Sequence, residues 1–285
     1  MKKKWLENGM RAAFLIAACA SIFAVALICV FLFMNGVPAI GKIGLNNFLL
    51  GREWKPTDVP PQFGILPMIL GSVYVTAGAI VIGVPIGIFV AIYLSMYAHP
   101  RIYAMMKPAV GLLAGIPSIV YGFFGMAAIV PLIRSLFGGN GSSILAASVL
   151  LGIMILPTII GIAESAMRAV PDSYYEGARA LGASHERSVF FVVLPAAKSG
   201  ILAAMVLGIG RAIGETMAVI MVAGNQARIP VSLMKGVRTM TANIVIEMGY
   251  AAGLHREALI ATGVVLFVFI MMINLSFSLL KRNRS

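Results

Sequence analysis

An arginine and a glutamate four positions apart, Arg211 and Glu215, lie within an otherwise apolar run. Residues at that spacing share one face of a helix, so we expect the two side chains to pair there. In a membrane-spanning segment, a charge at the middle of the bilayer raises the free energy of insertion by at least about 2.5–3.5 kcal/mol. These two residues are therefore candidates for a function. The alternative is an ion pair with a purely structural role.

The chemistry of this pair predicts the class of solute. A guanidinium offers forked donors that match an oxyanion. The carboxylate beside it would repel an anion without a proton, such as sulfate, but could accept a hydrogen bond from the P–OH group of protonated phosphate. The pair therefore favours protonated phosphate as the solute.

The elements that must hold this pair are membrane helices. Of the 285 residues, 60% are hydrophobic and only 11% are charged, whereas a soluble domain carries charge on about a quarter of its residues. Apolar runs of about 20 residues, the length that crosses a bilayer, recur along the chain. We predict an all-α polytopic membrane protein with six transmembrane helices, at about 12–33, 68–94, 108–132, 144–167, 197–222 and 257–280.

The distribution of basic residues predicts the orientation of these spans. The net charge is +12, and Lys and Arg favour the segments on one side, mainly the two terminal flanks with Lys2, Lys3, Lys4, Lys281, Arg282 and Arg284. We expect the protein to lie in the cytoplasmic (inner) membrane. By the positive-inside rule, both termini are then expected on the cytoplasmic side. We therefore attribute the positive charge to the orientation of the protein in the lipid membrane, and we predict no nucleic-acid partner.

A polar segment at 171–195 separates the fourth and fifth predicted spans and should face the cytoplasm. Ser173 and Glu176 have the spacing of a capping box, and Gly182 stands where a left-handed residue would end the first helix. A second short helix is expected from about Ser184. A structured hairpin between two spans indicates a surface for a partner.

Other polar residues are given structural roles. We expect Glu164, near the inner end of the fourth span, to snorkel to the interface, and Trp54 to act as an interfacial anchor. The prolines and glycines of spans two and three either break the helices along a transport pathway or allow close packing. The three histidines have no spacing typical of a metal site, so no metal ligand is predicted.

The hairpin contains the triplet Glu-Gly-Ala at 176–178, a glycine after three more residues, and Val-Val-Leu-Pro at 192–195. This pattern resembles the EAA signature of ABC importer permeases, with Gly177 and Val192 as departures in side chain. The resemblance implies a type I (MetI-like) permease fold whose coupling helices dock on an ATP-hydrolysing subunit. It assigns the coupling to Glu176, Gly177, Ala178, Gly182, Leu194 and Pro195, and the docking face to Tyr174, Tyr175, Leu181, Val189 and Phe190.

Three further motifs, at 64–67, 116–122 and 211–225, narrow the resemblance. They are similar to the PstC family of phosphate importer permeases, and the Met-Ala-Val after Gly-Glu-Thr favours it over the sibling PstA family. The likeness covers most of 64–280. It implies a substrate pathway that includes Arg211, Glu215, Thr216, Ser118, Tyr121 and Asn225.

The resemblance also implies the partners and the division of the chain. Residues 1–63 would form a cytoplasmic tail, the first transmembrane helix and an external loop, and 64–285 the permease core with five transmembrane helices. The chain would be no enzyme and bind no cofactor, because ATP and magnesium would sit on the ATPase. The implied partners are a PstA-like second permease, two copies of that ATPase and an extracytoplasmic phosphate-binding protein.

Three alternative functions stay open at this point. The nearest is a permease of the same class for another oxyanion, sulfate or molybdate. The second is an ion-coupled carrier, which would need no ATPase. Only the hairpin at 171–195 argues against this class. A membrane enzyme such as a phospholipid transferase is disfavoured because the ten Asp and Glu residues are scattered along the chain.

Overall fold

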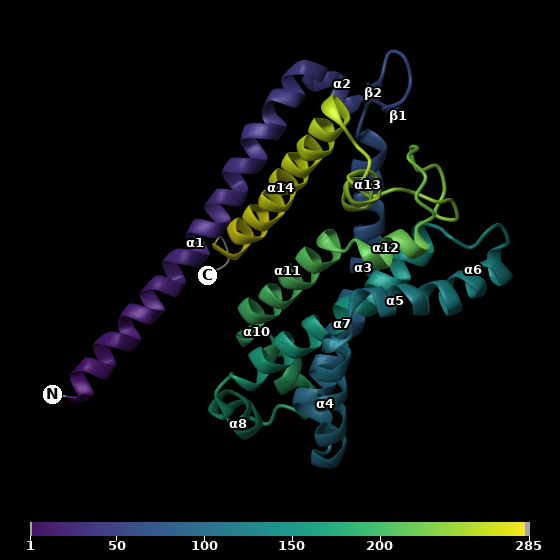
Figure 1. The fold of residues 1–285 in the computed structure, drawn as a ribbon. Helices are drawn as coiled ribbons and strands as arrows, with labels where there is room; N and C mark the ends of the chain where they lie inside the picture. The colour runs from purple at the N-terminus through teal and green to yellow at the C-terminus, as the bar shows by residue number, and fades with distance from the viewer. Residues whose placement is uncertain (1, 283–285) are drawn as a thin grey trace.

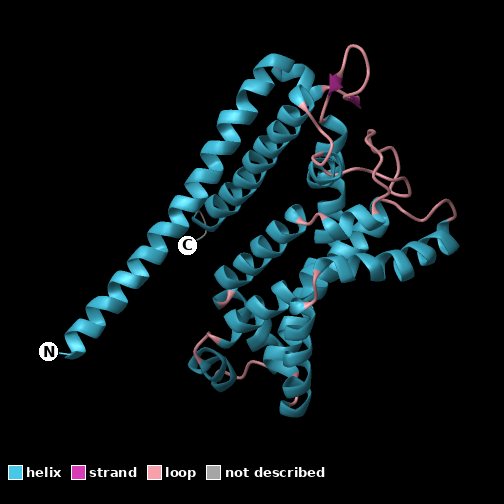
Figure 2. Ribbon diagram, in the orientation of Figure 1, coloured by secondary structure: helices cyan, strands magenta, loops and turns pink. Residues whose placement is uncertain are grey.

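The computed structural model of the chain describes residues 2–282, so Arg284 lies outside the described residues. Within that range the chain is helical apart from loops and two short strands (Figure 2). Five helices are long and apolar enough to cross a membrane, and six if a pair bent by 69° is counted as one span. The prediction of an all-α polytopic protein is confirmed.

The first and last helices pack against each other along one side of the molecule (Figure 1). Helix α1 is Lys2–Ile43 and helix α14 is Gly253–Arg282. With 42 residues, α1 is about 63 Å long and exceeds a hydrocarbon core of about 30 Å. A Cβ at Gly36 would lie 2.5 Å from a methyl carbon of Val264, so glycine permits this close approach.

Helix α1 continues ten residues beyond 33, the predicted end of the first span, into the segment predicted as an external loop. The short helix α2 (Leu45–Leu50) follows, and then a hairpin of β1 (Trp54–Lys55) and β2 (Gln62–Phe63), paired antiparallel. The role expected for Trp54 is wrong, because its side chain is only 6% exposed and packs in a core cluster with Phe48 and Met68. We call this end of the molecule the β-hairpin end.

The central scaffold is a closely packed pair of spans, α3 (Leu66–Ile92) and α7 (Ile144–Arg168). The π-helix η1 (Tyr93–Tyr97) extends α3. A Cβ at Gly83 or Gly87 would lie under 3.0 Å from atoms of α7. The glycines of the second span therefore serve close packing, and α3 stays a single helix through its internal proline.

The third predicted span, 108–132, is wrong in its bounds. Helix α4 (Pro100–Gly115) ends at Ile116, and a new apolar stretch begins with α5 (Ser118–Phe124) and continues through η2 (Gly125–Ile129) and α6 (Val130–Phe137). Pro117 lacks an N–H and disfavours the helical conformation of the residue before it. Accordingly, Ile116 is extended, with φ −68° and ψ 126°.

The fifth predicted span, 197–222, is divided. After α7 come a hairpin and its continuation, namely α8 (Asp172–Ala180), α9 (His185–Ser188), η3 (Val189–Val193) and α10 (Leu194–Ala196). Then follow α11 (Lys198–Gly214), α12 (Met217–Val222) and α13 (Met240–Glu247). Since α11 stops at Gly214, Arg211 and Glu215 do not share a continuous helix.

The contact between α1 and α14 gives a first testable prediction. Gly36→Val should lower the thermal unfolding midpoint of the purified protein in detergent, because the added methyl groups meet α14 at a distance that real contacts do not reach. Gly41→Val is the matched control, since a Cβ at Gly41 has no neighbour within 4 Å. Equal midpoints for the two variants would contradict the proposed packing.

Candidate functional site

The break between α11 and α12 is the centre of the candidate site. Glu215 is extended there, with φ −69° and ψ 130°. Its Oε1 accepts hydrogen bonds from the backbone N–H groups of Thr216 at 3.2 Å and Ala218 at 3.3 Å, so the carboxylate caps the start of α12. No ion pair between residues 2 and 282 joins it to Arg211. The predicted pairing on one helix face is wrong because the helix ends between the two residues.

Side chains also satisfy the carbonyl groups that this break sets free. The Thr216 hydroxyl donates to the carbonyl oxygen of Gly214 at 3.2 Å. The Thr241 hydroxyl, from α13, donates to the carbonyl oxygen of Glu215 at 3.2 Å. Irregular backbone at membrane depth needs such partners, and it is tolerated where it is buried in protein or lines a cavity.

Arg211 lies on α11, one turn before the break, and is half-buried. Its Nη1 donates to the hydroxyl oxygen of Thr158 on α7 at 3.3 Å. No sequence pattern singled out Thr158, because a threonine in a membrane helix is unremarkable by itself. The guanidinium is therefore held between two spans and is not neutralised by a carboxylate of the described residues.

The second break lies beside the first. Ser118 begins α5, and the buried Tyr121 donates its hydroxyl to the carbonyl oxygen of Leu113 at 2.9 Å, across the break between α4 and α5. Helix α5 packs against α12, and a Cβ at Gly122 would meet the Sδ of Met221 at 2.5 Å. Figure 1 shows α12 lying along α5. The two motifs that carry Ser118 and Glu215 are thus brought together.

Asn225 stands at the other end of α12, away from Arg211. It adopts φ +51°, and its side-chain amide donates to the carbonyl oxygen of Ile220 at 2.7 Å. Its own carbonyl oxygen accepts from Arg238 Nε at 3.1 Å. In this conformation Asn225 closes the end of α12 and does not meet the guanidinium of Arg211.

The predicted coupling hairpin is present, and it lies at the end of the molecule opposite the β-hairpin end. Gly182 has φ +84° between α8 and α9, as a left-handed helix end requires. Glu176, Gly177 and Pro195 are exposed, Ala178 and Leu194 are half-buried, and Leu181 is 91% exposed. The capping box of Ser173 is not formed, since α8 starts after Pro171 without a side-chain cap.

The predicted docking face needs one correction. Tyr174 and Phe190 are exposed, but Val189 is fully buried in a cluster with Ala163 and Met167 of α7. Tyr175 is also turned inward, and its hydroxyl lies 2.7 Å from Nδ1 of His185 on α9. The packing of Val189 fixes the hairpin to α7, and the Tyr175 contact joins α8 to α9.

Glu164 does not snorkel to the interface. Its side chain is only 1% exposed, and it binds Lys107, Tyr103 at 3.0 Å and Arg168 Nε at 2.5 Å. Tyr103 and Lys107 lie one turn apart on α4, so the buried carboxylate ties α4 to α7. The four-residue spacings place each pair on one helix face, Tyr103 with Lys107 and Glu164 with Arg168, but only the fold brings the two pairs together.

A second buried carboxylate joins segments far apart in the chain. Glu247 accepts from Trp54 Nε1 at 2.8 Å and Arg238 Nη1 at 2.6 Å, and it lies 2.8 Å from His255 Nε2. We call these four residues the Glu247 cluster. No sequence pattern predicted it, because its members are brought together only by the fold.

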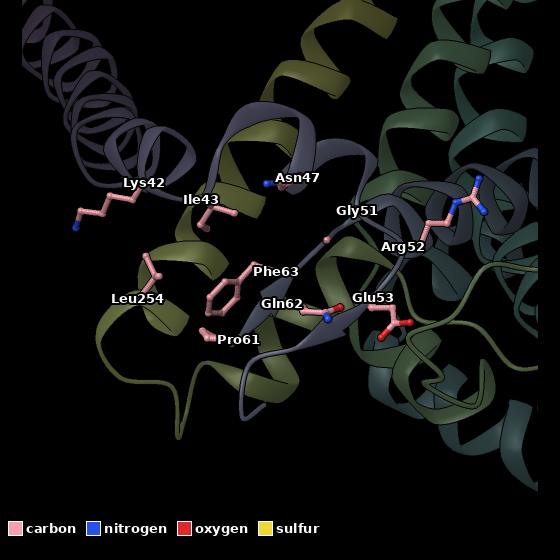
Figure 3. A pocket seen from close by; sticks show the side chains of 11 residues that line it. Lys42, Ile43, Asn47, Gly51, Arg52, Glu53, Pro61, Gln62, Phe63 and Leu254 are labelled. Carbon is pink, nitrogen blue, oxygen red and sulfur yellow. The ribbon is translucent and has the colours of Figure 1, made fainter. Parts of the chain in front are cut away.

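A cavity of about 470 Å³ opens at the β-hairpin end, between α1, α2 and the hairpin (Figure 3). Asn47, Gln62, Phe63 and Leu254 are among its lining residues. None of the residues assigned to the pathway or to coupling lines it, so this cavity is separate from the candidate site.

The capping role of Glu215 yields a second prediction. Glu215→Ala removes the acceptor of two backbone N–H groups and should destabilise the protein by about 1 kcal/mol, as loss of an N-terminal cap does. Glu215→Gln keeps a side-chain oxygen and should stay closer to the wild type. Thermal unfolding in detergent measures the stability of both variants. If both lost the same stability, the charge of Glu215 would be the stabilising feature instead of its role as a cap.

The chain is similar to known membrane transport proteins over most of its length. The model of a family described as "Binding-protein-dependent transport system inner membrane component" matches residues 83–284. A probable ABC transporter permease, YqgH of Bacillus subtilis, is 37% identical, with 93% of this chain and 89% of that protein covered. The phosphate transport system permease protein PstC of Mesorhizobium japonicum is 36% identical, covering 85% of this chain and 80% of the relative.

A solved structure supports the same conclusion at the level of fold. A chain of the MetNI methionine ABC transporter, in an inward-facing conformation, superposes with a TM-score of 0.61 at 20% identity, over 78% of this chain and 97% of that one. This similarity confirms the predicted MetI-like fold. The chain belongs to the family of binding-protein-dependent transport system inner membrane components, the permease subunits of ABC importers.

Proposed function

We propose that this chain forms one half of the pore of an ATP-driven importer that moves inorganic phosphate across the cytoplasmic membrane by alternating access. The observation that carries the proposal is the guanidinium of Arg211, held within a span beside two broken helices. Broken helices at membrane depth are typical of solute sites in transporters. The similarity to PstC proteins over most of the chain supports phosphate as the solute.

The surroundings of Arg211 suit a small oxyanion. Arg211, Glu215, Thr216 and Ser118 are all half-buried, so a solute could reach them from the pore. Although Glu215 does not pair with Arg211, its carboxylate keeps a negative charge at the break. That charge disfavours an anion without a proton, which supports protonated phosphate over sulfate or molybdate.

The exposed coupling residues support dependence on a separate ATPase. We propose that α8 and the Gly182 turn dock on a cytoplasmic ATPase, which is present in two copies and holds ATP and magnesium. Both chain termini would then lie in the cytoplasm. A PstA-like permease would complete the pore, and a phosphate-binding protein would deliver the solute at the β-hairpin end.

Replacement of Arg211 tests the solute assignment. In a complex reconstituted in liposomes, Arg211→Gln should reduce ATP-driven uptake of radiolabelled phosphate at least about tenfold, because a hydrogen bond to a charged group contributes about 1.5–3 kcal/mol. Arg228→Gln, in the loop after α12, is the control and should transport normally. Unchanged uptake by Arg211→Gln, or stronger competition by sulfate than by phosphate, would refute the assignment.

The Gly182 turn tests the coupling. Gly182→Val places a β-branched residue at φ +84° and should distort the turn, so ATP hydrolysis would no longer drive uptake. Gly182→Asn is the matched control, because asparagine tolerates this conformation. Phosphate uptake per ATP hydrolysed should fall several-fold in the valine variant only. Wild-type coupling in that variant would contradict docking through this turn.

A further inference from the structure

The hydrogen bond between Thr158 and Arg211 has a fixed direction. A guanidinium has donors only, so the hydroxyl oxygen of Thr158 must be the acceptor in this contact of 3.3 Å. A hydroxyl carries one donor and two acceptor positions. The O–H of Thr158 is therefore still available to donate while its oxygen holds Nη1 of Arg211.

Other hydroxyl groups in the spans use that donor within their own helix. Thr262 donates to the carbonyl oxygen of Ala258 at 2.9 Å, and Ser165 donates to that of Gly161 at 2.8 Å. This bond to the residue four positions earlier is the usual one for serine and threonine in helices. Among residues 2–282, Thr158 makes no such bond, which sets it apart from these hydroxyl groups.

The position of Thr158 relative to Arg211 is set by tight packing of α7 against α11. Ile159, the next residue, is fully buried. A Cβ at Gly208, three residues before Arg211, would lie 2.7 Å from Cγ1 of Ile159. The two helices therefore approach as closely as a glycine allows, and the hydroxyl and the guanidinium are held in register.

We propose that Thr158 is a further solute-contacting residue, whose O–H and the free N–H groups of Arg211 together donate to the oxygens of one oxyanion. The inference rests on the proposed phosphate transport and extends it to a residue on α7. Two donors from different spans fit a tetrahedral oxyanion, which presents several acceptor oxygens. The same contact keeps the guanidinium pointing toward the solute.

Two substitutions at one position test this inference in the reconstituted complex. Thr158→Val keeps the shape of the side chain and removes the hydroxyl, and it should raise the KM for inorganic phosphate roughly tenfold, with kcat within about twofold of the wild type. Thr158→Ser restores the hydroxyl and should restore the KM. A purely structural threonine would instead change the amount of assembled complex or kcat.

Thr262→Val is the matched control, since the Thr262 hydroxyl is bonded within α14 and should leave the KM unchanged. A wild-type KM in Thr158→Val, with phosphate transported normally by the unaltered complex, would overturn the inference alone. If the unaltered complex transported another oxyanion in place of phosphate, the phosphate assignment would be refuted. If Thr158→Val then raised the KM for that oxyanion, the inference that Thr158 and Arg211 together donate to the solute would still hold. If the valine variant does not assemble, Thr158→Ala provides the same comparison with serine.

Discussion

The break between Gly214 and Met217 is the constraint on which the candidate site depends. A backbone polar group without a partner in an apolar environment costs several kcal/mol, so each group that this break frees must be satisfied. The carboxylate of Glu215 accepts from two N–H groups, and hydroxyl groups from its own segment and from α13 serve the carbonyl oxygens. The polar residues gathered here thus have a structural task besides any contact with a solute.

The broken helices are held by a part of the molecule that is not broken. Helices α3 and α7 pack through glycines, and α11 approaches α7 at Gly208 in the same way. Because α7 contacts both neighbours, it holds Thr158 against Arg211 near its middle and the buried Glu164 near its end. The regular helices α3 and α7 thus form the support on which the irregular backbone of the candidate site is built.

The sequence predicted six apolar spans, and the structure has five such helices, or six with the bent pair counted as one span. The hairpin with its left-handed Gly182 was also predicted. Length, hydropathy and turn chemistry are local properties, so a single sequence reveals them. It did not predict that Arg211 and Glu215 are separate, since the four-residue rule holds only along an unbroken helix. The partner of Trp54 was also missed, because Glu247 lies 193 residues away and only the fold joins them. Tertiary contacts of this kind have no signature in a single sequence.

The Glu247 cluster has a consequence for biosynthesis. Trp54 leaves the ribosome early, whereas Glu247 follows 193 residues later, which is about 10–40 s at the usual rates of translation. During this interval the indole N–H has none of its final partners, and His255 arrives later still. The β-hairpin end therefore matures only after the start of the last helix has been synthesised, and a truncated nascent chain would leave it incomplete.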